Sequence, residues 1–401
     1  MRFLKNNASF RAAAFAAMLL LPAALSPASA QAETIDGKLP TERISVQSST
    51  PAIASLAKQA FNAHGDYTVD AKAALSLTLT KVNDTTVSAT CYAPKRGTKV
   101  TRDLSGANLE EATLRACDAM LGVEGRRPFF AGKLAFTSDR TGKKEIYASD
   151  LFLASVRPLT THGSISLAPR WTHDGTEVLY TTYANQNFTD IYAVNALNGR
   201  RRGVVVNARG TTIGAVSNPR TGQIAFASSA RGDMDIYLAD ANGANARCVI
   251  FTKGVETDPA WSADGLRLAL SSGAAGSPSI HVAKLPGGAL QRIKTNYSYS
   301  TEPAWNPVHP AKIAFTYYSG SFGIAIVDTD TGKVSPVKTK PAGNYANPTW
   351  CADGRHLVAT RIAGRSSRLA LIDTEREKVT VISGELMANC TSPDYFLSSR
   401  K

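Results

Sequence analysis

The chain reads Asp258-Pro-Ala-Trp-Ser-Ala-Asp-Gly265 at the clearest copy of a motif that holds every tryptophan of its 401 residues. The other copies surround Trp171, Trp305 and Trp350. Trp171 and Trp261 are 90 residues apart and the next two intervals are 44 and 45 residues, so the first interval holds two periods with a degenerate copy near residues 216–222. A repeat of roughly 40 to 50 residues is typical of a propeller or a solenoid.

Each period also holds two short apolar runs. The first run follows the Asp-Gly turn, as in Lys312-Ile-Ala-Phe315, and its second residue recurs at positions 134, 178, 224, 268, 313 and 357. The second run is exemplified by Asp190-Ile-Tyr192. Apolar and aromatic runs separated by Asp-Gly or Asn-Gly indicate consecutive hairpins, and four strands make one propeller blade. The sequence therefore predicts a mainly β protein with a six-bladed β-propeller over residues 131–401.

The ends of the repeat array predict how the ring closes. The first period begins near Gly132 without a Trp motif, whereas Thr391 to Leu397 is a spare first strand after the last period. We expect this C-terminal strand to complete blade one, because pairing the chain ends removes an open sheet edge. Each tryptophan is expected to pack between neighbouring blades.

The segment before the propeller begins with two parts that differ in composition. Residues 1–30 carry three basic residues, an apolar stretch and a small-residue site, which predicts a signal peptide cleaved between Ala30 and Gln31. The apolar stretch is too short for a lasting membrane span. Residues 31–51 are polar and turn-rich, and we interpret them as a mobile N-terminal arm.

Residues 52–130 predict a small α+β domain. Apolar residues have helical spacing over residues 53–64 and 109–121, and residues 73–81 and 85–92 read as a strand pair. A domain of about 80 residues is near the lower limit for an independent core. We therefore expect this domain to pack against the propeller.

Cysteine count and charge leave alternatives open. The odd number of cysteines means that at least one is unpaired within the chain. Pairing of Cys91 with Cys117 and of Cys351 with Cys390 is one hypothesis, and free structural thiols are the other. Loss of the three basic residues of the signal peptide lowers the net charge from +13 to +10. This excess indicates either a solubilising surface or a site for a polyanion, and a nucleic-acid partner is not expected for an exported protein.

Motifs of the common catalytic families do not occur in the sequence. There is no G-x-S-x-G, H-E-x-x-H or P-loop pattern, and the six histidines fall at different repeat positions. Asp258 and Glu302 could serve acid–base chemistry, but no third group joins them. We therefore expect a binding protein without a cofactor. A channel-site enzyme, such as a lactonase or lyase, is an alternative.

Asp258, Glu302 and Asn347 occupy one repeat position in three successive periods, two just before a Pro-Ala-Trp and one before a Pro-Thr-Trp. Equivalent positions on innermost strands face a shared channel, so their oxygens could converge there. One hypothesis is a weak Ca²⁺ site at Asp258 and Glu302, or a docking point for a Lys or Arg side chain. The other is a hydrated polar lining.

The order of export signal, small α+β domain and six blades resembles the TolB family, the periplasmic propellers of the Tol–Pal system. The likeness runs over residues 109–397 and includes Lys133-Leu-Ala-Phe-Thr-Ser-Asp-Arg140 and Thr257-Asp-Pro-Ala-Trp-Ser262. The small domain is shorter than is usual for the family, and Asn306-Pro-Val-His309 replaces one Asp-Gly turn. The resemblance implies a non-catalytic adaptor in the periplasm, which we expect to be a monomer.

The resemblance also implies two kinds of partner. A Pal-like peptidoglycan-associated lipoprotein would dock at the channel mouth, and Tol inner-membrane proteins would bind the N-terminal arm and the small domain, in support of outer-membrane integrity and invagination during division. By position, the docking surface would comprise Thr257, Asp258, Tyr297, Tyr299, Thr301, Glu302, Asn344, Tyr345 and Asn347. Tyrosines are favoured interface anchors, although these could equally cap blade edges. The alternative function is that of a related propeller that binds a peptide or a glycan.

Overall fold

The computed structural model describes residues 41–161, 163–184, 188–206, 210–384, 387 and 389–398. Residues Thr41–Lys401 belong to one compact unit. The predicted signal peptide with its cleavage site at Ala30 and Gln31, and residues 31–40 of the predicted arm, lie outside the described residues. Within the described ranges, no helix has the length and apolar character needed to cross a membrane.

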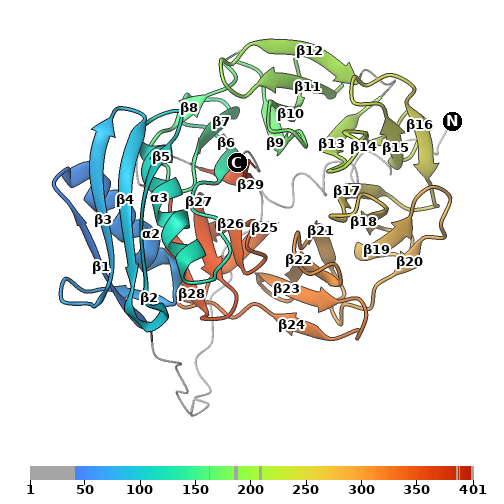
Figure 1. Ribbon diagram of the computed structural model, residues 1–401. Helices are drawn as coiled ribbons and strands as arrows, with labels where there is room; N and C mark the ends of the chain where they lie inside the picture. Colours follow the sequence, from blue (N-terminus) through green and yellow to red (C-terminus); the bar gives the residue numbers. More distant parts are fainter. Residues whose placement is uncertain are drawn as a thin grey trace, which may run out of the picture. The chain divides into compact units, whose positions relative to one another are not determined.

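Six four-stranded sheets form the predicted propeller, and Figure 1 shows their innermost strands around a common centre. From the centre outward, blade one consists of β29 (Thr391–Phe396), β6 (Lys133–Ser138), β7 (Glu145–Asp150) and β8 (Arg157–Pro158). Blade two consists of β9 (Ser166–Trp171), β10 (Glu177–Thr182), β11 (Asp190–Asn195) and β12 (Arg201–Val206). Blade three consists of β13 (Thr212–Ser217), β14 (Ile224–Ser228), β15 (Asp235–Ala239) and β16 (Arg247–Ile250).

The last three blades repeat this order. Blade four consists of β17 (Glu256–Trp261), β18 (Arg267–Ser272), β19 (Ser279–Lys284) and β20 (Gln291–Arg292). Blade five consists of β21 (Ser300–Trp305), β22 (Lys312–Tyr318), β23 (Phe322–Asp328) and β24 (Val334–Pro336). Blade six consists of β25 (Asn344–Trp350), β26 (His356–Ala363), β27 (Ser366–Asp373) and β28 (Lys378–Val381). The degenerate repeat near residues 216–222 thus forms a complete blade.

The C-terminal strand closes blade one, as predicted. β29 pairs antiparallel with β6, with Thr391 opposite Thr137 and Phe396 opposite Lys133. The tryptophans pack between blades as expected, and three of them also bond to the preceding blade. Their indole Nε1 groups donate to backbone carbonyls, Trp171 to Asp394, Trp261 to Val216 and Trp350 to Ala304.

The small domain is a sheet covered by two helices. The strand order is β2 (Tyr67–Val69), β1 (Glu42–Ser48), β3 (Leu75–Asn83), β4 (Thr86–Ala93) and β5 (Thr98–Ser105). A 3-10 turn, η1 (Pro94–Arg96), joins β4 to β5. The helices are α2 (Pro51–His64) and α3 (Leu109–Val123), which lie between this sheet and the propeller in Figure 1. The Asn108 side chain caps α3 by accepting from the Glu111 backbone N–H.

The interpretation of residues 31–51 as a mobile arm is wrong for residues 42–48. These residues form β1, which pairs parallel with both β2 and β3 inside the sheet. Ile44 is 0% exposed and Val46 is 5% exposed, so the strand is part of the core. Parallel strands are not joined by a tight turn, so the local sequence around β1 lacks the hairpin signal that marked β3 and β4.

One hydrophobic core joins the small domain to the propeller, which confirms that the domain packs against the ring. Phe129 and Phe130 lie between α3 and β6 in the chain and share this core with Phe136 of blade one and Leu369 of blade six. All five cysteines are free thiols. The hypothesis of free structural thiols is therefore confirmed, and both proposed disulfides are wrong.

Candidate partner-binding site at the channel mouth

The innermost strands share an unusual backbone conformation at one repeat position. The residues there have φ between 49° and 66°, and they are Ala168, Gly214, Asp258, Glu302, Asn347 and Ser392. A positive φ is uncommon for residues other than glycine. In each blade the pairing with the second strand slips at this point, as between Thr257 and Ala260. The slip is a β-bulge, a device that redirects a side chain within a sheet.

The bulge also ties four of the blades to the one before. In four blades the backbone N–H of the bulge residue donates to a hydroxyl on the second strand of the preceding blade. The pairs are Gly214 to Thr181 at 3.2 Å, Glu302 to Ser271 at 3.1 Å, Asn347 to Thr316 at 3.2 Å and Ser392 to Thr360 at 3.0 Å. These bulge residues are therefore held by their own blade and by the preceding blade. This double attachment fixes the side chains of Glu302 and Asn347.

Glu302 and Asn347 bond directly to one another. The Asn347 side-chain Nδ2 donates to Glu302 Oε1 at 2.5 Å, and the Asn347 backbone N–H donates to Glu302 Oε2 at 2.8 Å. The Thr316 hydroxyl also donates to Glu302 Oε2, at 2.7 Å. Burial, together with the nearby charge of Asp258, raises the pKa of the Glu302 carboxyl.

Asp258 belongs to the same group. Its Oδ2 accepts from the hydroxyls of Thr257 and Ser271, each at 3.0 Å. Burial raises the pKa of the Tyr299 phenol, and the charges of Glu302 and Asp258 add to this rise. Ser271 also accepts from the Glu302 backbone N–H, so it links Asp258 to Glu302. Hydrogen bonds thus connect Asp258, Glu302 and Asn347, whereas a partner-binding role of these residues stays a prediction.

Arg170 of blade two contributes a positive charge that acts on the carboxyls of Glu302 and Asp394. Arg170 follows the bulge of blade two by two residues, and its charge opposes the rise that burial causes in the pKa of both Glu302 and Asp394. Asp394 occupies the matching position of blade one, and its Oδ2 accepts from the Trp171 backbone N–H at 2.7 Å. Neither residue was predicted. Both lie two residues after a bulge, at a repeat position that holds Ala260 and Ala304 in other blades, so no repeated polar pattern marks it.

The Ca²⁺ hypothesis finds little support in this geometry. The described residues contain no group of three or more His, Cys, Asp or Glu side chains placed to hold a metal ion. The oxygens of Glu302 already accept from the Asn347 amide and the Thr316 hydroxyl, whereas Ca²⁺ requires about six to eight oxygen ligands. The arrangement favours a polar lining that can accept a donor group from a partner.

The remaining predicted residues lie toward the rim of blades five and six. Tyr297 is half-buried and stacks on Tyr317, with ring centroids 3.9 Å apart. Thr301 is half-buried at the start of β21, and the Asn344 Oδ1 accepts from the Phe322 backbone N–H at 3.0 Å. These positions remain candidates for contact with a partner.

Tyr345 differs from the prediction of an exposed anchor. It is 2% exposed, and its hydroxyl donates to the Pro341 carbonyl at 3.2 Å. Its ring belongs to the core of blades five and six, because strand alternation on β25 directs this position inward. Tyr345 can therefore form part of a pocket wall but cannot project into a partner.

Residues 122–393 match the family model described as the TolB beta propeller domain. The chain belongs to the TolB β-propeller domain family. A protein TolB homolog of Chlorobium luteolum is 35% identical over 149 residues, which cover 37% of this chain and 33% of the relative. A Tol-Pal system protein TolB of Desulfosudis oleivorans is 31% identical over 130 residues, or 32% of this chain and 29% of the relative. The chain thus spans about a third of the length of these TolB relatives.

The TolB fold extends over nearly the whole chain. The crystal structure of TolB from Acinetobacter baumannii aligns with a TM-score of 0.76 and covers 90% of this chain and 98% of its own, at 17% sequence identity. A putative TolB from Agrobacterium tumefaciens aligns with a TM-score of 0.53 over 66% of this chain, at 16% identity. At such low identity these likenesses show the fold, here a TolB-like propeller with its small domain.

Proposed function

We propose that this TolB-family propeller is a non-catalytic periplasmic adaptor of a Tol–Pal system. In this proposal, it binds a Pal-like lipoprotein at the channel mouth and Tol inner-membrane proteins through its N-terminal arm and small domain. It thereby supports outer-membrane integrity and invagination during division. The names of the relatives, among them Tol-Pal system protein TolB, support this assignment. We further propose that the protein acts as a monomer and binds no nucleic acid.

The observation that carries the proposal is the fixed polar group at the channel mouth. Glu302 is held by Asn347 and Thr316, while Asp258 is held by Thr257 and Ser271. Such pre-organised acceptors lose little conformational entropy when they bind. Tyr299 beside them supplies the amphipathic ring that protein interfaces favour. The group suits a protein loop that presents a Lys or Arg side chain to the channel.

The positions of several histidines argue against a channel-site enzyme. His64 and His356 lie at the junction of the small domain with the propeller, with ring centroids 4.9 Å apart. His281 is buried in blade four, where its Nδ1 lies 3.1 Å from the Ser279 carbonyl. These three therefore do not accompany Asp258 and Glu302. A carboxylate pair alone does not identify a reaction, because a reaction class requires further groups in convergent geometry.

The test is a pull-down from envelope extract with residues 31–401, with bound proteins identified by mass spectrometry. We expect recovery of a Pal-like lipoprotein and of Tol inner-membrane proteins. The variant Glu302→Gln should weaken lipoprotein binding by at least ~10-fold, because a buried charge-assisted hydrogen bond would be lost.

Glu177→Gln is the matched control for this experiment. Glu177 pairs with Arg202 at 3.2 Å on blade two, away from the bulge ring, and its substitution should leave binding unchanged. Equal recovery with Glu302→Gln and wild type would remove the channel mouth from the proposal. Enrichment of another peptide or of a glycan-bearing component, without a lipoprotein, would favour the alternative propeller function.

A further inference from the structure

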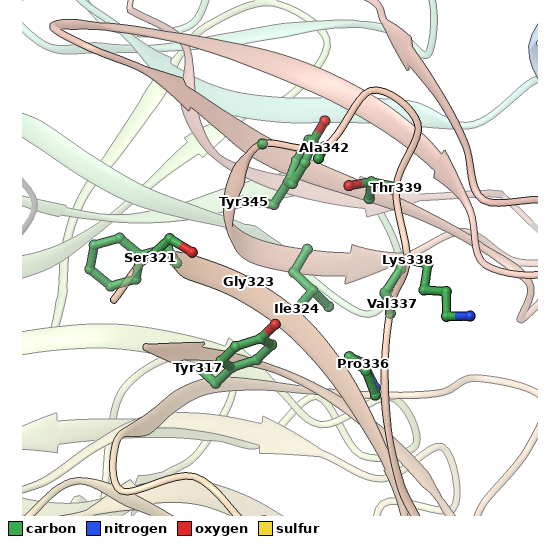
Figure 2. Close-up of a pocket in the computed structure, with 12 residues that line it drawn as sticks. Tyr317, Ser321, Gly323, Ile324, Pro336, Val337, Lys338, Thr339, Ala342 and Tyr345 are labelled. Carbon is green, nitrogen blue, oxygen red and sulfur yellow. The ribbon is translucent and has the colours of Figure 1, made fainter. Parts of the chain in front are cut away.

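A cavity of about 330 Å³ lies at the rim of blade five. It forms where the turn between β22 and β23 faces the segment that leads from β24 into β25 (Figure 2). Its walls include Tyr317, Phe322, Ile324, Val337, Thr339 and Tyr345. Ligand pockets span about 300 to 1,000 Å³, so this cavity suits a single large side chain rather than an extended ligand.

The aromatic walls of the cavity are held in place. The Tyr317 ring stacks on Tyr297 with an interplanar angle of 11°. It also covers Gly323, where an added Cβ would lie 2.5 Å from the ring, so this close approach requires glycine. On the other side, the Tyr345 hydroxyl is bonded to the Pro341 carbonyl. A ligand would thus meet preformed walls and would lose little affinity to reorganisation.

Aromatic side chains gather around this cavity. Tyr318 is 37% exposed, and its ring lies 5.1 Å from that of the half-buried Phe322. Together with Tyr297 and Tyr317 they form an aromatic group at blade five, beside Tyr345 of blade six. Protein interfaces are enriched in Tyr and Phe, and the residues that dominate binding energy sit in well-packed pockets of this kind.

Strand β25 links the cavity to the candidate site at the channel mouth. The Asn344 Oδ1 accepts from Phe322 at the cavity rim, and the same strand β25 carries Asn347, which bonds to Glu302. Only two residues separate Asn344 from Asn347. A protein that contacts both ends of this stretch of β25 would reach the cavity as well as the channel mouth.

We infer that this cavity receives a large apolar side chain of the protein that docks at the channel mouth. The inference rests on the proposed adaptor function, and it names the anchor that this function needs. The half-buried side chains of Phe322 and Val337 provide apolar surface for the anchor, and the buried Ile324 lies at the cavity wall behind them. The hydroxyls of Tyr317 and Thr339 can bond to the main chain on either side of it. A segment with an aromatic or long aliphatic residue, presented on a loop, fits this chemistry.

The first test probes the cavity without any partner. Isoleucine methyl groups of residues 31–401 are labelled for NMR, and the Ile324 resonance is identified with Ile324→Val. N-acetyl-L-phenylalaninamide should shift the Ile324 resonance, whereas methyl glucoside should not. Ala342→Phe, which places a ring at the cavity mouth, should abolish the shift. Ala289→Phe, at an exposed turn of blade four, is the control and should retain it.

Absence of a shift with the amide would overturn the inference. A shift with the glucoside alone would also overturn it and would identify a saccharide site. Thermal melts of both variants confirm that they fold.

The second test uses the purified lipoprotein. Ala342→Phe should weaken its binding by at least ~10-fold, as expected for loss of a central anchor, and Ala289→Phe should not. If Ala342→Phe binds as wild type while Glu302→Gln is impaired, the adaptor function stands and the anchor site is wrong. If wild type binds no lipoprotein, the adaptor function fails, and the NMR result alone decides whether the cavity accepts an apolar side chain.

Discussion

Arg355 of blade six donates two hydrogen bonds to Asp66 of the small domain, with Nη1 2.7 Å from Oδ2 and Nη2 3.0 Å from Oδ1. Asp66 also accepts from Arg126 and Arg376, so one carboxylate faces three guanidinium groups. These charges hold the pKa of the Asp66 carboxyl well below its usual range, against the effect of burial. The Arg355 Nη2 also donates to Asp373 Oδ2 at 2.6 Å. The small domain, the connecting segment and blade six meet at this cluster.

His356 lies beside this cluster as a buried imidazolium. Its Nδ1 is 2.5 Å from Asp353 Oδ2, and its Nε2 is 3.0 Å from the carbonyl of His64. Both partners are acceptors, so both ring nitrogens donate. Burial alone would lower the pKa of His356, but the bond to Asp353 outweighs burial and raises it. The neutral His64 ring lies against it, and burial with the His356 and Arg355 charges lowers the pKa of His64 to about 2.

Asp66→Asn should destabilise the protein strongly. The change removes the charge that Arg126, Arg355 and Arg376 share, and breaking a buried ion pair typically costs about 3 to 5 kcal/mol in the free energy of unfolding. Asp70→Asn is the control, because Asp70 pairs with Arg43 at the surface, where a pair contributes about 0 to 1 kcal/mol. Urea denaturation measures both. Equal losses for the two variants would show that the cluster does not fasten the small domain.

His64 should make the protein less stable as the pH falls below about 6.5. Since the folded-state pKa of His64 is lowered to about 2, the unfolded chain binds one more proton than the folded chain between these values. Stability then falls by about 1.4 kcal/mol for each pH unit. Asp66 and His356 contribute their own pH dependence equally to wild type and variant.

The variant His64→Gln has no group that takes up this proton in the unfolded chain. The difference in unfolding free energy between wild type and variant should therefore change by about 1.4 kcal/mol per pH unit between pH 6 and pH 4. Urea denaturation at several pH values measures it. Parallel pH profiles would mean that His64 is protonated in the folded protein.

Thr316→Val should weaken the contact between blades five and six. The Thr316 hydroxyl donates to Glu302 and accepts from the Asn347 backbone N–H. Loss of a hydroxyl that serves buried partners costs about 1 to 3 kcal/mol. Thr137 is the equivalent residue of blade one, and its buried hydroxyl has no hydrogen-bond partner among the described residues. Thr137→Val should therefore be neutral or stabilising in thermal unfolding, and a comparable loss in both variants would argue against the bulge network.

Asp394→Ala should loosen the closure of the ring. Asp394 of β29 accepts from the Trp171 backbone N–H, so alanine would leave this N–H unpaired between blades one and two, at a cost of about 1 to 3 kcal/mol. Asp394→Asn keeps an acceptor oxygen and should recover most of the loss. The urea midpoints of Asp394→Ala and Asp394→Asn, each compared with wild type, measure the two losses of stability. If asparagine is as damaging as alanine, the charge near Arg170 matters more than the hydrogen bond.

The six blades and the closing strand followed from the sequence because each depends on local signals that repeat. Trp261 and its equivalents mark the end of an innermost strand, and Asp-Gly turns such as Asp264-Gly265 mark the hairpin that follows. The spare strand at Thr391 has no blade of its own, so only blade one could accept it. The convergence of Asp258, Glu302 and Asn347 followed in the same way, since equivalent positions in a ring face one channel.

Other features were decided by contacts between distant parts of the chain. The sequence around β1 predicts an arm, because the partners β2 and β3 are parallel and leave no turn signal beside it. For Tyr345 the sequence allows an interface anchor or a blade-edge cap, because strand alternation alone does not say which face of β25 meets a neighbouring blade. The bond between Asp66 and Arg355 joins residues 289 positions apart, a separation at which no sequence periodicity operates.

Recurring local motifs account for the repeat, the number of blades, the ring closure and the residues that share the channel. The attachment of the small domain and the cavity at blade five depend on contacts that form only in the folded chain. A repeat encodes the same local geometry many times, so it can be read from the sequence. A charged cluster or a pocket arises once, from side chains that only the packed chain brings within bonding distance.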